Sequence, residues 1–549
     1  MPQACASSAT RSGRLTDPAG NEVAKSNDHM TPADSTSAAT DPGTGQGGKP
    51  LRPGLQAVLD AQAATLDENR PAAVAKQHAR GRWTAREGVA ALLDADSLVE
   101  YGALTKPATA GMEGAADGLV TGTGTMDGTP VTIVAYDYSV YAGTQSANNH
   151  IKISRMFGYA EDHRLPIICW LDGGGARPHD MFVSGRIGSP TFVTFSRMSG
   201  VAPTIGIVPG RAFAGHANIA GLCDCTIATR KASMGMAGPP LVEAALGVKL
   251  TPEEIGPAEV HVKSGAVDLL AEDEAEACAL AKKYLSFFSG PKPAGPAPDQ
   301  AALREMVPES PRRAYDVRKV IAGLADTDSM LELKPAYGRA MVTALTRING
   351  HTVGVVANQP MVLAGAMDGP ACEKAARFVQ ICDAYDIPVL LLCDTPGLMV
   401  GPEIEKTCLV RRSARLLSAL ANATVPIMTL VLRKAYGLGF YIMGSRPLNP
   451  AILLAWPTAE FGGMGLEGAA SIIYQRELAA IEDLDERAAQ HRAYTDDLKA
   501  YNTALRVGER YGFDDVIDPA DTRTILSRTL DTFPEPPRRT SRKRIIEPI

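Results

Sequence analysis

The sequence predicts an α/β protein built from two copies of one strand–helix unit, and three observations lead to this prediction. The chain has 549 residues, too many for one compact core, so two domains of roughly 200 to 250 residues are expected. Apolar runs such as VTIVAYD (131–137) and LPIICWLD (165–172) have the length and composition of buried strands. Residues 128–172 also align with residues 350–394 at a constant shift of 222 (350 minus 128).

The two aligned segments share residues along their whole length. The coinciding pairs are Gly128 and Gly350, Val131 and Val353, Ala135 and Ala357, Gly143 and Gly365, Lys152 and Lys374, Arg155 and Arg377, Pro166 and Pro388, and Asp172 and Asp394. One inserted residue then brings RAFAG (211–215) onto KAYGL (434–438). Each copy is therefore expected to run strand, helix, strand, glycine-bearing turn, helix, strand, and a small-residue turn that enters an apolar helix.

The order of segments along the chain follows from composition. Residues 1–50 are rich in Ser, Thr, Gly, Asp and Ala, which predicts a disordered tail. The pattern becomes helical from Leu51 to about Asp96. A Pro-rich stretch at about 289–314 indicates a linker, so we expect one domain at 51–298 and a second at 299–535. The basic end, 536–549, is expected to be solvated.

Charge and cysteine usage limit the class of protein. The formal net charge of −6 argues against nucleic-acid binding, and no run of 18 uncharged apolar residues is present to span a membrane. The N-terminus lacks the apolar core of a secretory signal. Nine cysteines are scattered singly except for CDC (223–225), which suits reduced thiols in a cytoplasmic protein. A lone C-x-C is a weak metal signal, and we expect no metal site.

The stretch RKAYGLGFYIMG (433–444) points to chemistry, because it joins the buried run VPIMTLVL (425–432) to an apolar helix through glycines. The first N–H groups of a helix have no partner within the helix and carry partial positive charge. Small residues let an oxygen approach that backbone, and an apolar surrounding strengthens each donor. The alternative is a purely structural role, in which these glycines only permit close packing of strand and helix. Recurrence of such a bend at 211–215 favours two oxyanion sites.

Several stretches together carry a resemblance to a known family. These are VANQPMVLAGAMDGPACEKAARFVQICDAYDIPVLLLCDTPGLMVG (356–401), ATVPIMTLVLRKAYGLGFYIMGSR (423–446), AWPTAEFGGMG (455–465), GGGAR (173–177) and YGFDDVIDPADTR (511–523). They resemble the carboxyltransferase (β) subunit of biotin-dependent acyl-CoA carboxylases of the propionyl-CoA and acetyl-CoA type, and the likeness extends from about residue 51 to 535.

The resemblance implies two tandem crotonase-like domains, each a ββα superhelix, in a homo-hexamer. The first domain would bind acyl-CoA and the second carboxybiotin, with active sites between domains of different protomers. By analogy with the family, the backbone N–H groups of one oxyanion hole would come from Ala214 and Gly215, and those of the other from Leu438 and Gly439. The further substrate-binding residues implied are Gly174, Gly175, Ala176, Arg177 and Tyr441.

Some residues depart from the family pattern. Leu438 stands where the family commonly has Gly, and Tyr441 stands where it often has Asp. PHDM (178–181) replaces the family's IQEG. These departures leave the identity of the acyl-CoA substrate undetermined. A hydrolase with a Ser-His-Asp triad is disfavoured because no G-x-S-x-G occurs. His179 and Asp180 are expected to form a solvated turn rather than an acid–base pair.

The chain has no Met-Lys dipeptide of a biotin carrier and no Walker-type loop. Biotin is therefore expected on a partner, the biotin carboxylase and carrier subunit, with no nucleotide bound here. The expected activity is carboxyl transfer from carboxybiotin to the α-carbon of an acyl-CoA. Two alternatives are a carboxyltransferase subunit of an acyl-CoA decarboxylase, and an inactive structural subunit of a mixed hexamer.

Overall fold

The computed structural model describes residues 51–183, 189–310, 313–536 and 541–548. Internal contacts group residues 57–549 into one compact unit and separate them from the chain up to Gln56. The predicted tail at 1–50 lies outside the described residues. The predicted division into domains at residues 298 and 299 stays a prediction, because both halves belong to the same compact unit.

The first half is built on a seven-stranded sheet, with two antiparallel pairs at one edge and parallel pairs in the rest. The strands, in spatial order, are β1 (Val99–Glu100), β2 (Leu119–Met126), β3 (Thr129–Tyr136), β4 (Ile167–Trp170), β5 (Thr204–Val208), β7 (Cys225–Thr229) and β9 (Leu269–Ala271). Two short strands, β6 (Arg211–Phe213) and β8 (Ser233–Gly235), pair separately.

The second half repeats this arrangement in an eight-stranded sheet. Its strands are β10 (Leu331–Leu333), β11 (Met341–Ile348), β12 (His351–Asn358), β13 (Val389–Thr395), β14 (Ile427–Tyr436), β15 (Ile452–Ala455), β17 (Asp515–Val516) and β16 (Glu460–Gly462), which pairs with the end of β14. The duplicated order is present in both halves, since β3, α4 and β4 correspond to β12, α13 and β13.

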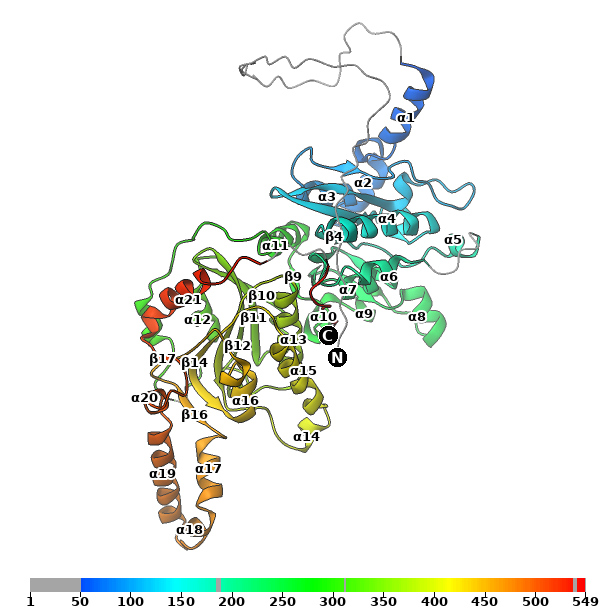
Figure 1. The fold of residues 1–549 in the computed structure, drawn as a ribbon. Helices are drawn as coiled ribbons and strands as arrows, with labels where there is room; N and C mark the ends of the chain where they lie inside the picture. The colour runs from blue at the N-terminus through cyan, green and yellow to red at the C-terminus, as the bar shows by residue number, and fades with distance from the viewer. Residues whose placement is uncertain (1–50, 184–188, 311–312, 537–540, 549) are drawn as a thin grey trace, which may run out of the picture. The chain divides into compact units, whose positions relative to one another are not determined.

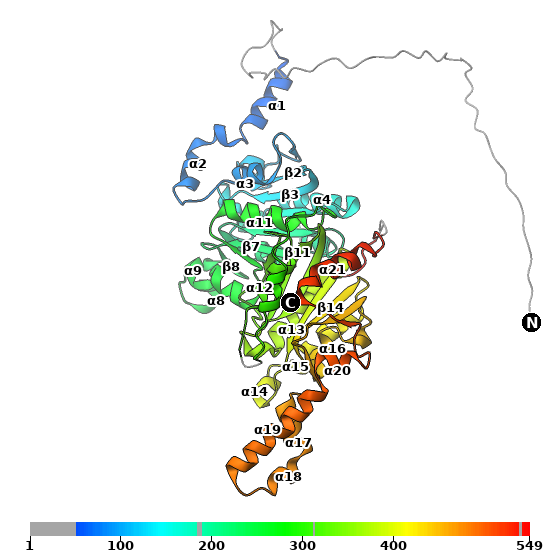
Figure 2. The ribbon, with the colours of Figure 1, turned by 90° about the vertical axis from the view of Figure 1, so that its left-hand side faces the viewer.

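Helices cover the faces of both sheets (Figures 1 and 2). The helices of the first half are α1 (Pro53–Ala63), α2 (Pro71–His78), α3 (Ala85–Leu92), α4 (Ala147–His163), α5 (Pro178–Val183), α6 (Thr191–Ser196), α7 (Gly215–Leu222), α8 (Pro239–Leu246), α9 (Pro252–Ile255), α10 (Ala258–Ser264) and α11 (Glu274–Ser286). Those of the second half are α12 (Val317–Leu324), α13 (Gly369–Ala384), α14 (Pro402–Glu405), α15 (Leu409–Ala421), α16 (Gly437–Ile442), α17 (Leu466–Ile473), α18 (Gln475–Ala479), α19 (Leu484–Tyr501), α20 (Ala504–Gly508) and α21 (Thr522–Asp531).

One apolar core joins the two halves. It contains residues of α3 and α11 against the first sheet, and residues of α13 and α15 against the second sheet. A separate core lies under α4, α6 and α7, and another under α12 and α21. Burial on both faces explains why the parallel strands are nearly continuous apolar runs in the sequence.

The C-terminal segment 541–548 differs from the solvated end that its composition predicts. Ile546 is 5 % exposed and packs with Ile381 and Ala384 of α13. Its N–H donates to the Ser199 hydroxyl in the first half, at 2.8 Å. Lys543 forms ion pairs with Asp383 (3.2 Å) and Asp386 (2.8 Å). The charges of this segment are therefore neutralised by acidic residues that are distant in the sequence.

Candidate functional site

The second bend connects β14 to α16, and at Gly437 and Gly439 it leaves no room for a side chain. Gly437 has φ of +54°, and a Cβ atom there would lie 2.8 Å from the Gly463 carbonyl oxygen. A Cβ atom at Gly439 would lie 2.6 Å from the Cα of Gly397. The backbone of the bend thus contacts two other backbone segments closely. Within the described residues, the N–H groups of Leu438 and Gly439 have no acceptor outside the helix.

Leu438 and Tyr441 form an apolar face next to these N–H groups. They are separated by three positions and therefore lie on the same side of α16. Leu438 is 52 % exposed and Tyr441 is 41 % exposed. An open N–H pair beside an uncharged face suits a ligand that combines a carbonyl oxygen with an apolar body. The small and apolar residues noted in the sequence therefore form a surface, not only a packing contact.

The first bend joins β6 to α7 and has equivalent geometry. Ala214 has φ of +52° and aligns with Gly437, 223 residues later (437 minus 214). The Ala214 N–H donates to the Gly235 carbonyl at 2.9 Å. This bond corrects the expectation that Ala214 offers a free donor, since its hydrogen is used within the protein. The Gly215 N–H has no acceptor among the described residues.

Buried aspartates anchor both bends at equivalent positions. Asp172 follows β4 and accepts the N–H of Arg211 at 3.0 Å. Asp394, in β13, accepts the N–H of Lys434 at 3.2 Å and pairs with the Arg433 guanidinium at 3.1 Å. Neither aspartate residue is more than 2 % exposed. Each bend is thus fixed to the neighbouring strand by the same interaction.

The glycine turn at 173–177 lies against the first bend. A Cβ atom at Gly175, where φ is +99°, would be 3.3 Å from the Cβ of Ala214. Gly174 donates its N–H to the Ala142 carbonyl at 2.9 Å. Gly174 and Ala176 are exposed, and the Ala176 N–H has no acceptor among the described residues. The backbone of this turn is therefore open to a ligand.

Arg177, by contrast, is directed into the protein and is 2 % exposed. Its guanidinium binds Asp117 (2.7 Å), Asp180 (3.2 Å) and the carbonyl of Thr144 (3.1 Å). The structure places Arg177 behind the turn, where it holds the backbone instead of facing a ligand. Asp180 is fully buried, so the expected solvated turn is wrong for this residue.

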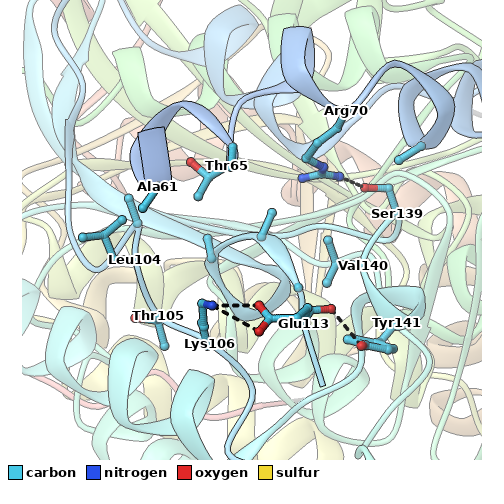
Figure 3. Close-up of a pocket in the computed structure, with 16 residues that line it drawn as sticks. Ala61, Thr65, Arg70, Leu104, Thr105, Lys106, Glu113, Ser139, Val140 and Tyr141 are labelled. Carbon is cyan, nitrogen blue, oxygen red and sulfur yellow. Dashed lines mark hydrogen bonds and ion pairs between the residues drawn. The ribbon is translucent and has the colours of Figure 1, made fainter. Parts of the chain in front are cut away.

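A cavity of about 740 Å³ lies between the N-terminal helices α1 and α2 and the segments 103–106, 113–116 and 139–141 (Figure 3). Tyr141 lines it, and the next residue, Ala142, binds the glycine turn through its carbonyl. The Tyr141 hydroxyl donates to the Glu113 carbonyl at 2.8 Å. An exposed ion pair between Lys106 and Glu113 (2.9 Å) stands at the same wall. The cavity thus has a mixed polar and apolar lining, and Ala142 links its wall to the glycine turn predicted to contact acyl-CoA.

Sequence reasoning missed the polar side chains packed around the first bend. Gln145, Tyr136 and His216 are all buried there. Burial lowers the pKa of His216 to about 4, so its imidazole is neutral. A comparison of the two repeats could have drawn attention to these residues, because the second half has different side chains at the same positions. Met367 replaces Gln145, Asn358 replaces Tyr136 and Gly439 replaces His216.

Comparison with known proteins shows the family. Residues 76–545 match the model of the carboxyl transferase domain. The chain belongs to the carboxyl transferase family. Relatives include the methylmalonyl-CoA carboxyltransferase 12S subunit of Propionibacterium freudenreichii subsp. shermanii, 39 % identical over 84 % of this chain and 90 % of the relative. The propionyl-CoA carboxylase β chain of Saccharopolyspora erythraea is 38 % identical over 83 % of this chain and 89 % of the relative.

Solved structures of the carboxyl transferase family have the same fold. The transcarboxylase 12S hexamer with methylmalonyl-coenzyme A bound is 36 % identical, with a TM-score of 0.80 over 88 % of this chain and 97 % of the other. A single-chain, multi-domain long-chain acyl-CoA carboxylase is 42 % identical, with a TM-score of 0.81 over 87 % of this chain. This chain spans 50 % of that larger protein. The predicted family, crotonase-like fold class and carboxyltransferase enzyme class are confirmed.

Three further features of this carboxyl transferase concern membrane helices, the CDC cysteines and metal ligands. Within the described ranges, no helix has both the length and the apolar character needed to cross a membrane. Cys223 and Cys225 are buried, and burial raises the pKa of both thiols well above the usual value. The described residues contain no group of three His, Cys, Asp or Glu placed to hold a metal ion.

Proposed function

We propose that the chain transfers a carboxyl group from carboxybiotin, carried by a separate protein, to the α-carbon of an acyl-CoA. The observation that carries this proposal is the pair of equivalent strand-to-helix bends in a member of the carboxyl transferase family, with an open N–H at Gly215 in the first and at Leu438 and Gly439 in the second. Bound carboxybiotin would supply the CO2 and the acceptor for the α-proton. The chain's own task is to stabilise charge on two ligand oxygens.

At the first bend, the Gly215 N–H would bind the thioester oxygen as it gains negative charge. The adjacent turn through Gly174, Gly175 and Ala176 would contact the acyl-CoA through its backbone, and Arg177 would hold that turn from behind. The cavity beside Tyr141 would take part of the coenzyme A. In other enzymes, one oxyanion-hole donor stabilises the transition state by about 3 kcal/mol.

At the second bend, the N–H groups of Leu438 and Gly439 would bind the ureido oxygen of biotin. The apolar face of Leu438 and Tyr441 fits the uncharged ring system of that group and excludes water from the reacting atoms. No ionisable side chain is needed for the proton transfer in this scheme. The biotin carboxylase and carrier would be a separate partner in the cytoplasm.

Two apolar helices support assembly with other copies of the chain. Helix α8 has no buried residue, with Leu241 61 % and Leu246 69 % exposed. Helix α17 follows the corresponding strand of the second half and exposes Ile472 (64 %) and Ile473 (59 %). In both views α17 and α19 extend beyond the second sheet (Figures 1 and 2). Burial of these faces in a hexamer would bring the first bend of one copy to the second bend of another.

The test is decarboxylation of methylmalonyl-CoA or malonyl-CoA by the purified chain with free biotin, followed by a panel of acyl-CoAs of increasing length. We expect biotin-dependent release of CO2. We also expect Tyr441, at the edge of the second bend where the acyl group would meet carboxybiotin, to influence which acyl group is preferred. A chain that assembles and binds acyl-CoA but releases no CO2 would instead be the inactive structural subunit. An ATP-dependent biotin carboxylase as the partner would establish carboxylation as the physiological direction.

A further inference from the structure

Gln145 connects the two backbone segments that form the first site. Its N–H donates to the Gly175 carbonyl at 2.8 Å, and its own carbonyl accepts the Arg177 N–H at 2.7 Å. The residue is 3 % exposed. Its main chain therefore fixes the position of the glycine turn, which contains the open N–H of Ala176.

The side chain of Gln145 reaches the other segment, the bend at Gly215. A Cβ atom added at Gly215 would lie only 2.0 Å from Gln145 Oε1, so the carboxamide fills the space that a side chain there would need. The Gln145 Nε2 donates to the Tyr136 hydroxyl at 3.1 Å. Tyr136 is fully buried, and its ring meets His216 edge-on at a centroid distance of 4.3 Å. Tyr136 thus fixes the Nε2 end of the amide, while the Oε1 end contacts the bend at Gly215.

The second half lacks this side-chain arrangement. Met367 and Asn358 stand at the positions of Gln145 and Tyr136, each 222 residues later (367 minus 145; 358 minus 136). The Met367 N–H donates to the Gly397 carbonyl at 3.1 Å, so the backbone contact is kept without an amide. A buried amide costs free energy unless it is hydrogen-bonded. The buried amide of the second half, Asn358, accepts the Asp394 N–H at 3.2 Å and does not stand at the position of Gln145. An amide at the position of Gln145 therefore indicates a task that the second bend does not have.

We propose that Gln145 is a positioning residue of the first site, which fixes the Gly215 bend and the 174–176 turn relative to one another. This inference rests on the proposed function and adds the residue that makes the two sites unequal. Donors aimed at a developing oxyanion act strongly only when they are held in place before the reaction. A shift of about 1 Å can lower the rate by about 100-fold.

Gln145→Met tests this role, because it introduces the residue that the second half uses at the equivalent position. We expect kcat for biotin-dependent decarboxylation of methylmalonyl-CoA to fall by about 10- to 100-fold with little change in KM. The matched control is Gln380→Met, since Gln380 is also buried and bonds Glu547 of the C-terminal segment, away from both bends. Wild-type kcat in Gln145→Met would overturn the inference, as would an equal loss in Gln380→Met.

A second variant separates positioning from simple packing. Gln145→Glu keeps the shape but places a carboxyl group at Gly215, where its negative charge would oppose charge on the ligand oxygen. Because the carboxylate forms as pH rises, we expect the kcat of this variant to decline with increasing pH relative to the wild type. A pH profile parallel to that of the wild type would contradict the proposal.

Hydrogen exchange distinguishes failure of this inference from failure of the proposed function. Amides in peptides spanning 173–177 and 211–222 should exchange faster in Gln145→Met than in the wild type. This readout does not require turnover. Absence of decarboxylation activity in the wild type would contradict the proposed function alone. Equal amide exchange rates in these peptides of Gln145→Met and the wild type would contradict the role of Gln145.

Discussion

Lys152 and Lys374 are buried cations at equivalent positions in the two halves. The Lys374 Nζ donates to the carbonyls of Tyr337 (3.1 Å) and Met341 (2.8 Å), and the Lys152 Nζ donates to those of Ala116 (3.2 Å) and Leu119. Burial lowers the pKa of Lys374 to about 7 and that of Lys152 to about 8. Both amines satisfy carbonyls where a strand of the sheet begins.

These lowered pKa values predict that stability depends on pH. Between the folded pKa of about 7 and the unfolded pKa of 10.5, the unfolded state binds more protons than the folded state at Lys374. The free energy of unfolding should therefore increase from pH 7 to pH 9, by up to about 1 kcal/mol per pH unit for one such group. Urea unfolding of Lys374→Met at both pH values should show a smaller increase than the wild type.

Lys263 offers the matched control for this experiment, because it is exposed. Lys263→Met should retain the pH dependence of the wild type. Equal pH dependence in Lys374→Met and the wild type would show that the Lys374 amine keeps its proton in the folded protein.

For single residues, the sequence located the two bends but did not show which of their backbone N–H groups are already hydrogen-bonded within the protein. The Ala214 N–H is used by Gly235, a residue 21 positions later (235 minus 214) that β8 brings alongside β6. Similarly, Arg177 is directed inward by Asp117, which is 60 positions earlier. Such partners depend on how distant strands pair, and no local pattern around the bends contains that information.

Among the larger elements, the C-terminal segment 541–548 shows how composition can mislead. Its basic residues suit a solvated end, yet Arg544 Nε pairs with Asp383 at 2.8 Å and Glu547 pairs with Arg415 at 3.0 Å. The segment contacts both Ser199 of the first half and α13 of the second. Strands were easier to predict, because VTIVAYD and LPIICWLD are apolar throughout and correspond to β3 and β4.

Ile546→Ala measures the contribution of this segment to stability. Truncation of a buried isoleucine leaves a cavity next to Ile381 and Ala384, and we expect a loss of about 2 to 4 kcal/mol in the free energy of unfolding. The neighbouring Ile545 is 54 % exposed, so Ile545→Ala should change stability by less than about 0.5 kcal/mol. Similar urea midpoints for the two variants would mean that the segment is not docked in solution.

For the whole molecule, the duplication gives each chain two different bends. The repeat was readable in the sequence because glycines, aspartates and strand residues recur at one spacing. The exposure of the apolar side chains of α8 and α17 could not be predicted from the sequence. Helices that pack within a chain have the same composition as helices that pack between chains. Those exposed faces carry the expectation that a working site contains the first bend of one copy and the second bend of another.

Mixing two defective variants tests that expectation directly. Gly215→Pro removes the N–H at the first bend, and its ring also displaces the Gln145 carboxamide, so the first bend is disabled on both counts. Leu438→Pro removes an N–H at the second bend; both positions lie in the first turn of a helix, where the backbone conformation of proline is compatible with the helix. Each variant alone should be inactive. Co-expressed copies that pair at random should recover about a quarter of wild-type activity, because half of the pairs are mixed and one of their two sites is intact. Biotin-dependent decarboxylation of methylmalonyl-CoA by the doubly tagged, purified mixture is the measurement, with each variant co-expressed with itself as the control. Absence of recovered activity in correctly folded, mixed assemblies would place both bends of a site within one chain.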